Sequence, residues 1–147
     1  ELFLSSENTL MINAPLVCDD TLQTNDIARI YPDGSFTILG RKDNVINSGG
    51  IKVQAEEIER LLQSSIPVPF VITSVPDRRL GQAVTLLIEG QMEISALGTK
   101  LESVLASYYR PKYIYTVNHI PQTGNGKINR KECRVLAESL QLLGRQE

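Results

Sequence analysis

The sequence excludes several classes of protein through what it lacks. Its 147 residues include no tryptophan, one histidine and two cysteines, and no apolar run approaches the about 20 residues that a membrane-spanning helix needs. Cys18 and Cys133 do not have the spacing of a metal or redox site, and they suggest no disulfide framework. We therefore expect no metal site, no membrane partner and, by default, a reducing cytoplasmic compartment.

A strong charge of either sign is also missing. The net charge is −2, with 22% charged and 41% hydrophobic residues, which is an ordinary balance for a globular protein. Such a chain has no global basic field for nucleic acid, so we expect no nucleic-acid partner. The sequence begins Glu-Leu-Phe-Leu, with neither an initiator methionine nor the pattern of a signal peptide, and we expect it to be cut from a longer protein.

Hydrophobic periodicity predicts two regions of different character. Up to residue 40, short apolar stretches alternate with turns, and Pro-Asp-Gly at 32–34 predicts a hairpin that joins strands over 27–31 and 36–39. Residues 41–50 are expected to form a polar loop. Farther on, helices are expected over 55–63, 93–109 and 131–143, and strands over 69–75, 83–89 and 113–118. The predicted fold class is α+β: a small α/β layer with a three-stranded sheet covered by helices, preceded by a β-hairpin piece.

The helical patterns also predict which side chains face the core. The expected inward residues are Ile58, Leu61 and Leu62 in the first helix; Ile94, Leu97, Leu101, Val104, Leu105 and Tyr108 in the second; and Cys133, Leu136, Ala137, Leu140 and Leu143 in the last.

Three polar stretches interrupt this scaffold: QTNDIARI at 23–30, GRKDNVINSGGIKVQAEEIE at 40–59 and IPQTGNGKINRK at 120–131. Each stretch alone is most often an ordinary surface feature, such as a solvated turn or an ion pair. In the last of them, turn-forming residues place Lys127 on a loop tip. This loop is not a phosphate-cradling P-loop, because Pro121 occupies the place of its first glycine and Ile128 the place of its hydroxyl residue.

In this order and spacing, the stretches resemble the adenylate-forming family, which includes acyl-CoA synthetases, luciferases and the adenylation domains of peptide synthetases. Thr24-Asn25-Asp26 resembles the family's Thr-Gly-Asp, with asparagine as a mild departure because it also tolerates a left-handed backbone. The segment 40–59 resembles Gly-Arg-x-Asp, followed by a glycine turn, a basic residue and Glu-(Ile/Val)-Glu. Val-Pro-Asp at 75–77 precedes Gly-Gln at 81–82, and residues 121–130 match Pro-x-Thr-x-x-Gly-Lys-(Ile/Leu)-x-Arg at every defined position. The resemblance covers about residues 25–136.

The resemblance implies the C-terminal lid domain of an acid–thiol ligase over 43–147, preceded over 1–42 by the last strands of a large N-terminal domain that is otherwise missing. The family's reaction has two halves: a carboxylate attacks the α-phosphate of ATP to give an acyl-adenylate and pyrophosphate, and a thiol then displaces AMP. ATP, Mg²⁺ and CoA are therefore expected for the full-length enzyme. We expect the isolated chain to fold, to bind none of them tightly and to be inactive.

The resemblance also assigns roles to individual residues. Lys127 is the expected catalytic residue, a fixed positive charge between two anions during adenylation. Asp26 and Arg41 are expected to contact ATP, and Asp43 to be the hinge about which the lid rotates between the two half-reactions. The remaining assignments, Gly49, Gly50 and Lys52, lie on the side along which CoA is expected to pass, since glycine leaves room for its thin pantetheine arm.

Other interpretations remain open. The turn INSGGIKV at 46–53 resembles that of several CoA ligases, including o-succinylbenzoate–CoA ligases of menaquinone biosynthesis, whereas peptide-synthetase domains more often have Gly-His-Arg there. One alternative is an adenylation domain that loads a carrier protein. Another is a small binding module whose basic patch, formed by Lys127, Arg130, Lys131 and Arg134, binds RNA or an acidic protein; the net acidic chain and the lack of neighbouring exposed aromatics count against RNA. The lone His119 is interpreted as structural.

Overall fold

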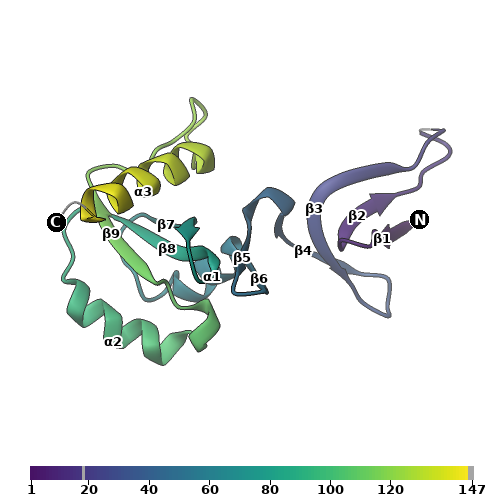
Figure 1. Cartoon of the computed structure of the whole chain (residues 1–147). Helices are drawn as coiled ribbons and strands as arrows, with labels where there is room; N and C mark the ends of the chain where they lie inside the picture. The colour runs from purple at the N-terminus through teal and green to yellow at the C-terminus, as the bar shows by residue number, and fades with distance from the viewer. Residues whose placement is uncertain (18, 146–147) are drawn as a thin grey trace. The chain divides into compact units, whose positions relative to one another are not determined.

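The computed structural model describes residues 1–17 and 19–145, so Cys18 lies outside the described residues. The chain divides into two compact units, Glu1–Val45 and Ile46–Glu147, and every α-helix of the described part belongs to the second (Figure 1). Among the described residues, no helix is both long and apolar enough to cross a membrane. The functional boundary expected between residues 42 and 43 stays a prediction.

The first unit is a four-stranded antiparallel sheet in the order β1-β2-β3-β4. Its strands are β1 (Leu2–Leu4), β2 (Thr9–Ile12), β3 (Leu22–Ile30) and β4 (Phe36–Arg41). The predicted hairpin is confirmed, with Ile30 opposite Phe36. Its loop turns on Gly34 (φ +87°), whose N–H donates to the Tyr31 carbonyl at 3.0 Å, while the Asp33 carboxylate accepts the Ser35 N–H at 2.9 Å. Glycine accepts such a positive φ without strain.

The first unit has little core of its own. Among its described residues only Thr9, Leu10 and Ala28 are buried. Large apolar side chains are instead exposed on its strands and loops: Leu2, Phe3, Leu16, Val17, Leu22, Tyr31, Phe36 and Ile38. A small sheet is stabilised mainly by burial of one apolar face, and in this unit many of the large apolar side chains stay exposed instead.

The second unit is built on a five-stranded sheet. Its strands are β5 (Val45–Ser48), β6 (Ile51–Gln54), β7 (Phe70–Asp77), β8 (Gly81–Glu89) and β9 (Tyr113–Val117). The order is β6-β5-β8-β7, and β9 pairs with β8 in parallel. The expected strands correspond to β7, β8 and β9, so the mixed α/β fold is confirmed, but the sheet has two more strands than the three predicted.

The two additional strands come from the region around residues 41–50, where we expected a polar loop. A short 3₁₀ turn, η1 (Lys42–Asn44), leads into β5, and β5 and β6 are too short and polar to give a clear alternating pattern. Each still contributes one deeply buried apolar side chain, Ile46 in β5 and Val53 in β6, which are 3% and 1% exposed. Burial of these two residues fixes strands that sequence periodicity did not reveal.

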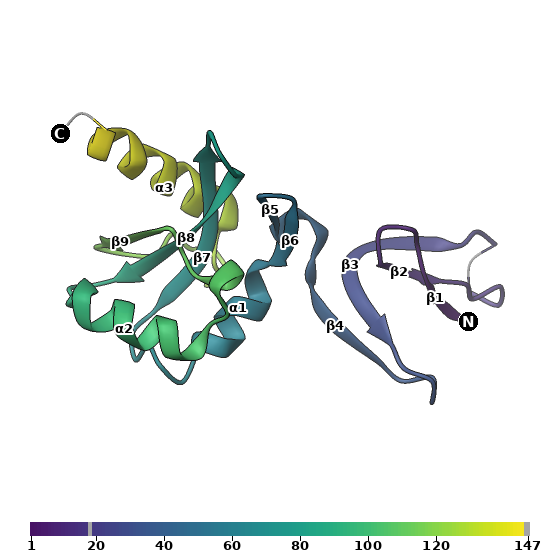
Figure 2. The ribbon, with the colours of Figure 1, turned by 60° about the horizontal axis from the view of Figure 1, so that its bottom comes forward.

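Helices cover both faces of this sheet. Helices α1 (Ala55–Leu62) and α2 (Ile94–Val104) pack on one face, and α3 (Arg130–Arg145) packs on the other (Figures 1 and 2). Strand β8 is buried on both sides: Val84, Leu86 and Ile88 face α1 and α2, whereas Ala83 and Leu87 face α3. This two-sided burial explains why β8 is a nearly continuous apolar run.

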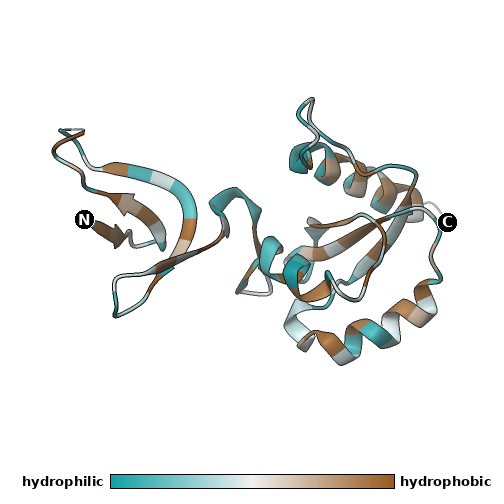
Figure 3. Ribbon diagram, turned by 180° about the vertical axis from the view of Figure 1, so that it is seen from behind, coloured by the Kyte–Doolittle hydropathy of each residue, from teal (hydrophilic) through white to brown (hydrophobic). Residues whose placement is uncertain are grey.

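The predicted helix faces are only partly correct. Hydrophobic residues recur along α2 and α3 with hydrophilic ones between them (Figure 3), but five residues expected in the core are instead 38–60% exposed: Leu61, Ile94, Val104, Tyr108 and Leu143. Four of them lie at the margins or ends of their helices, where the periodic pattern continues although no neighbouring element covers it, and Tyr108 lies beyond the end of α2.

The second helix is also shorter than predicted. It ends at Val104, and residues Ser107–Tyr109 form a separate 3₁₀ turn, η2. The Arg110 guanidinium donates to the carbonyls of Leu105 (3.0 Å) and Glu102 (3.1 Å). A basic side chain that satisfies the last carbonyls is a common way to end a helix, and one that a hydrophobic pattern does not reveal.

Candidate functional site

Lys127 lies on an exposed hairpin tip between β9 and α3, as the sequence predicted. The Thr123 N–H donates to the Lys127 carbonyl at 2.7 Å, the Gly126 N–H donates to the Thr123 carbonyl at 2.9 Å, and Gly126 has φ +78°. This is a three-residue loop closed by a glycine in the left-handed region. The Lys127 ammonium forms no hydrogen bond or ion pair with any described residue, so its charge is available to a ligand.

The base of this hairpin is fixed by an ion pair that sequence reasoning missed. The first residue of α3, Arg130, forms two hydrogen bonds to the Glu59 carboxylate on α1, at 2.7 and 3.1 Å. The two side chains are only 28% and 16% exposed, and Glu59 also accepts the Ile72 N–H at 2.9 Å. Burial alone would lower the pKa of Arg130, but the hydrogen bonds and charge of Glu59 outweigh it and the pKa is raised. The Lys127 side chain is thus exposed to solvent, while the base of its hairpin is anchored through Arg130.

The first unit brings Asp26 and Arg41 together. They are paired residues of β3 and β4, and the Arg41 guanidinium donates to Asp26 Oδ1 at 2.9 Å. Thr24 Oγ1 accepts the Asp26 N–H at 3.2 Å and donates to the Leu10 carbonyl at 2.8 Å, which fixes the backbone at Asp26. Both charged side chains are partly exposed, so they are accessible to a ligand.

Asp43 is the exposed middle residue of η1. The turn lies at the end of the first unit: Arg41 before it and Val45 after it both have extended backbones, and the Val45 N–H donates to the Lys42 carbonyl. Its neighbour Lys42 forms an ion pair with Glu7. A short turn between extended residues is a suitable place for a change of backbone direction, and the hinge role of Asp43 stays a prediction.

The Gly49–Gly50 pair forms the two-residue turn between β5 and β6. Both glycines have positive φ, +60° and +84°, which is the requirement of a type I′ hairpin turn. The Gly49 N–H donates to the Leu80 carbonyl at 2.8 Å, and a Cβ on Gly49 would lie 3.1 Å from Leu80 Cδ2. A Cβ on Gly50 would meet open space. Lys52, two residues farther on β6, is exposed, and its ammonium pairs with no described residue.

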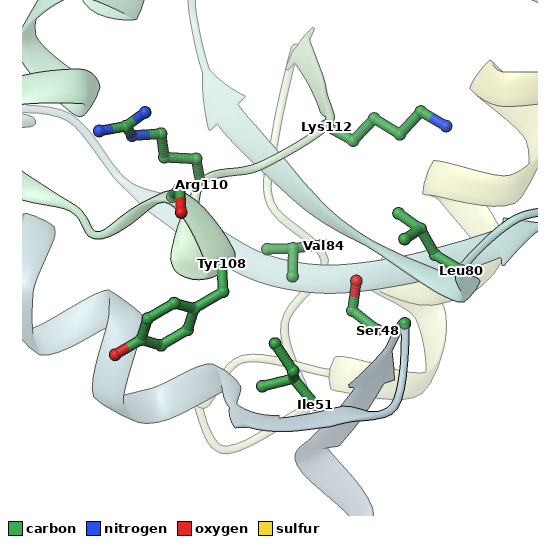
Figure 4. A pocket seen from close by; sticks show the side chains of 9 residues that line it. Ser48, Ile51, Leu80, Val84, Tyr108, Arg110 and Lys112 are labelled. Atoms are coloured by element: carbon green, nitrogen blue, oxygen red, sulfur yellow. The ribbon is translucent and has the colours of Figure 1, made fainter.

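A pocket of about 350 Å³ lies beside this turn, and the sequence did not predict it. Figure 4 shows its lining side chains from β5, β6, β8 and the segment before β9. The pocket is lined by Ser48, Gly49, Ile51, Leu80, Val84, Ser107, Tyr108, Arg110 and Lys112. It therefore combines an apolar floor, a half-exposed tyrosine ring and two cations. The only hint in the sequence was the alternation of Tyr108, Arg110 and Lys112 ahead of the last strand.

One of the pocket's cations has a strong partner. Lys112 Nζ donates to Asp77 Oδ2 at 2.5 Å, and the hydrogen bond from Lys112 lowers the pKa of Asp77 to about 2. The same contact raises the pKa of Lys112. Lys127 does not line this pocket, and within the second unit it and the glycine turn lie on different segments, the hairpin between β9 and α3 and the turn between β5 and β6.

The remaining sequence candidates give little sign of chemistry. His119 is exposed, with Nδ1 3.9 Å from a Glu89 oxygen. In the proposed basic patch, Arg130 is neutralised by Glu59, and Arg134 bonds to the Ser74 hydroxyl and approaches Glu138. Within residues 1–17 and 19–145, no three His, Cys, Asp or Glu side chains gather as metal ligands would.

Comparison with known proteins agrees with the motifs. No protein-family model matches the chain. It is 38% identical over 126 residues to triostin synthetase I of Streptomyces triostinicus, covering 82% of this chain and 24% of that protein. It is 33% identical over 113 residues to the 2-succinylbenzoate–CoA ligase of Lactococcus lactis, covering 76% and 25% respectively.

A solved structure gives the same result. The acyl-CoA synthetase (AMP-forming)/AMP-acid ligase II-like protein of Dyadobacter fermentans aligns with a TM-score of 0.60 and 30% identity, over 90% of this chain and 40% of that one. The chain spans about a quarter of the length of the curated relatives it matches. In sequence and in fold, this chain belongs to the adenylate-forming acyl-CoA synthetase family and corresponds to its C-terminal domain.

Proposed function

We propose that the chain is the C-terminal part of an ATP-dependent carboxylate–CoA ligase, which forms an acyl-adenylate and then a thioester. The observation that carries the proposal is the separation of two surfaces in the second unit. One presents an unpaired lysine on an anchored hairpin, and the other presents a glycine turn beside a pocket with two cations. Two half-reactions that need different groups at one reaction centre are well served by a lid that turns first one surface and then the other toward it.

Lys127 serves the first half-reaction in this proposal. The attacking carboxylate and the α-phosphate of ATP are both anions, so the transition state needs positive charge between them. The Lys127 ammonium supplies a compact charge with three donors, and its glycine-flanked tip allows it to reach into a centre on another domain. Arg130 and Glu59 hold the base of the hairpin, so that only the long side chain has to be ordered when the lid closes.

The glycine turn and its pocket serve the second half-reaction. A pantetheine arm is thin, and the space at Gly50, where a Cβ would meet no atom within 4 Å, lets such an arm lie along the turn with Lys52 at its side. The nucleotide end of CoA carries an adenine ring and phosphates. The ring of Tyr108 and the cations Arg110 and Lys112 are chemically suited to these groups.

In this proposal, Asp26 and Arg41 bind ATP. Arg41 engages Asp26 Oδ1, which leaves the other carboxylate oxygen to accept hydrogen bonds from ribose hydroxyls, while Arg41 can also reach a ribose or phosphate oxygen. Mg²⁺ enters only as the counter-ion of ATP, and no residue of this chain is assigned to it.

The missing partner in this proposal is a large N-terminal domain of the same protein. The exposed apolar side chains of the first unit support it, because a sheet with three buried residues gains stability when a larger domain covers it. We therefore propose residues 1–42 as the last strands of that domain and residues 43–147 as the lid.

For the substrate, we propose o-succinylbenzoate and a role in menaquinone biosynthesis in the cytoplasm. The support is the small-residue turn at 46–53, together with the similarity to a 2-succinylbenzoate–CoA ligase. The alternative is an adenylation domain that loads a carrier protein. The two differ in the thiol: free CoA accepts the acyl group in the first case, and a pantetheinylated protein does so in the second.

The test is pyrophosphate release with ATP and a panel of carboxylates, followed by product analysis with CoA or a carrier protein. The complete ligase that contains this sequence should release pyrophosphate and form an acyl-CoA, with o-succinylbenzoate preferred. The 147-residue chain alone should do neither. Turnover by the chain alone would contradict the assignment as a lid, and acyl transfer only to the carrier protein would favour the alternative.

A further inference from the structure

A nearly buried carboxylate lies directly behind the glycine turn. Asp77, the last residue of β7, has a side chain that is only 4% exposed. Its Oδ1 accepts the backbone N–H groups of Arg79 (2.9 Å) and Leu80 (3.0 Å), and its Oδ2 accepts Lys112 Nζ. One carboxylate thus fixes the turn between β7 and β8 and also binds the ammonium group of Lys112, which is 35 residues farther along the chain.

The turn that Asp77 organises is the support of Gly49. The Leu80 carbonyl accepts the Gly49 N–H, and a Cβ on Gly49 would lie 3.1 Å from Leu80 Cδ2. Ser48 pairs with Gly81 in the sheet. A change in the conformation of the Leu80 peptide would therefore shift the glycine turn directly.

Asp77 also sets the position of a pocket wall. Leu80, Gly49 and Lys112 all line the pocket, and Asp77 holds both Leu80 and Lys112 although it does not line the pocket itself. Within the described part of the chain, the hydrogen bonds of the Asp77 side chain go to Arg79, Leu80 and Lys112, and none goes to the Lys127 hairpin. Its influence is thus directed to one of the two surfaces.

We propose that Asp77 is a positioning residue for thioester formation, holding the Gly49 turn and the Lys112 ammonium in the places that the thiol substrate needs. This inference rests on the proposed function. The competing explanation is that Asp77 only caps a turn, as Asp33 does in the first unit, where it accepts the Ser35 N–H and hydroxyl. A capping role alone would change stability without distinguishing the two half-reactions.

The first measurement concerns geometry and uses the 147-residue chain. Asp77→Asn keeps the size of the side chain but turns amide hydrogens or a neutral oxygen toward Lys112, so the cation loses its charged partner. We expect the Gly49 amide to exchange with solvent about tenfold faster or more in Asp77→Asn, measured by NMR, because its acceptor peptide is loosened. The matched control, Asp33→Asn, should leave the Gly49 exchange rate unchanged.

The second measurement separates the half-reactions in the complete ligase. Since a misplacement of about 1 Å can cost about 10²-fold in rate, we expect Asp77→Asn to lower thioester formation from supplied acyl-adenylate by about tenfold or more, with a raised KM for CoA. Pyrophosphate release in the first half-reaction should stay within about twofold of wild type, a change too small to indicate a lost catalytic contact. Asp33→Asn should change neither.

The possible failures are distinguishable. If the wild-type ligase forms no thioester, the proposed function and this inference fall together. If the wild type is active and Asp77→Asn lowers both half-reactions equally, or leaves the Gly49 amide exchange unchanged, the inference is overturned and the proposed function stands.

Discussion

Breaking the Glu59–Arg130 pair tests how firmly the Lys127 hairpin is anchored. The variants are Glu59→Gln, Arg130→Met and the double substitution, compared with wild type in a double-mutant cycle. The pair makes two charge-assisted hydrogen bonds, at 2.7 and 3.1 Å, between side chains 28% and 16% exposed. A hydrogen bond to a charged group contributes about 1.5–3 kcal/mol, and desolvation of both partners offsets part of the gain. We expect a coupling free energy of about 2 kcal/mol, above the roughly 0.2–1 kcal/mol of exposed pairs.

The assay is urea unfolding followed by far-UV circular dichroism, which reports mainly the second unit because all described α-helices lie there. Arg134→Met and Glu138→Gln provide a matched control cycle, since their contact is 4.0 Å long and both side chains are more than 40% exposed. That cycle should give about 0.3–0.5 kcal/mol. Equal coupling free energies in the two cycles would refute the claim that Glu59 and Arg130 hold the hairpin.

Three further predictions concern the hinge, acid stability and the buried thiol. In the complete ligase, Asp43→Pro should strongly reduce thioester formation, and it should preserve adenylation if the locked backbone matches the adenylation conformation. Asp43→Ala should reduce thioester formation less. Equal behaviour of the two variants in half-reaction assays would place the hinge elsewhere. The hydrogen bond from Lys112 lowers the pKa of Asp77 to about 2, so the stabilising contribution of this carboxylate is present above about pH 4 and is lost as the pH falls toward 2. The difference in unfolding free energy between wild type and Asp77→Asn should therefore shrink over that range. A constant difference would contradict this prediction. Burial raises the pKa of Cys133 to about 11, so in a Cys18→Ser background a thiol reagent near neutral pH should react no faster than the protein opens; rapid reaction with the native chain would contradict the burial.

Most of the features that were predicted correctly are turns, which depend on a few adjacent residues. Pro32-Asp33-Gly34, Gly49-Gly50 and the glycine-flanked Lys127 each depend on a few adjacent residues, and the structure gives each of them a glycine with positive φ. The long apolar runs that became β7 and β8 were equally clear, since their burial on both faces leaves little ambiguity.

The partners of the site residues could not be predicted, because they come from distant parts of the chain. Glu59 and Arg130 are 71 residues apart, and Asp77 and Lys112 are 35 apart. One alternative interpretation of the sequence placed Arg130 in a surface basic patch, whereas the structure engages it in a partly buried ion pair. Local sequence shows which side chains carry charge, but only tertiary packing decides which charges meet.

The central claim is that Lys127 acts in adenylation alone, and half-reaction kinetics of Lys127→Ala in the complete ligase test it most directly. Loss of a charge aimed at the transition state should lower pyrophosphate release by about 10²–10³-fold, or about 2.7–4 kcal/mol. Thioester formation from supplied acyl-adenylate should be unchanged. Lys131→Ala, which removes the same charge from the exposed start of α3, should affect neither half-reaction. An equal loss of both half-reactions in Lys127→Ala would contradict the account.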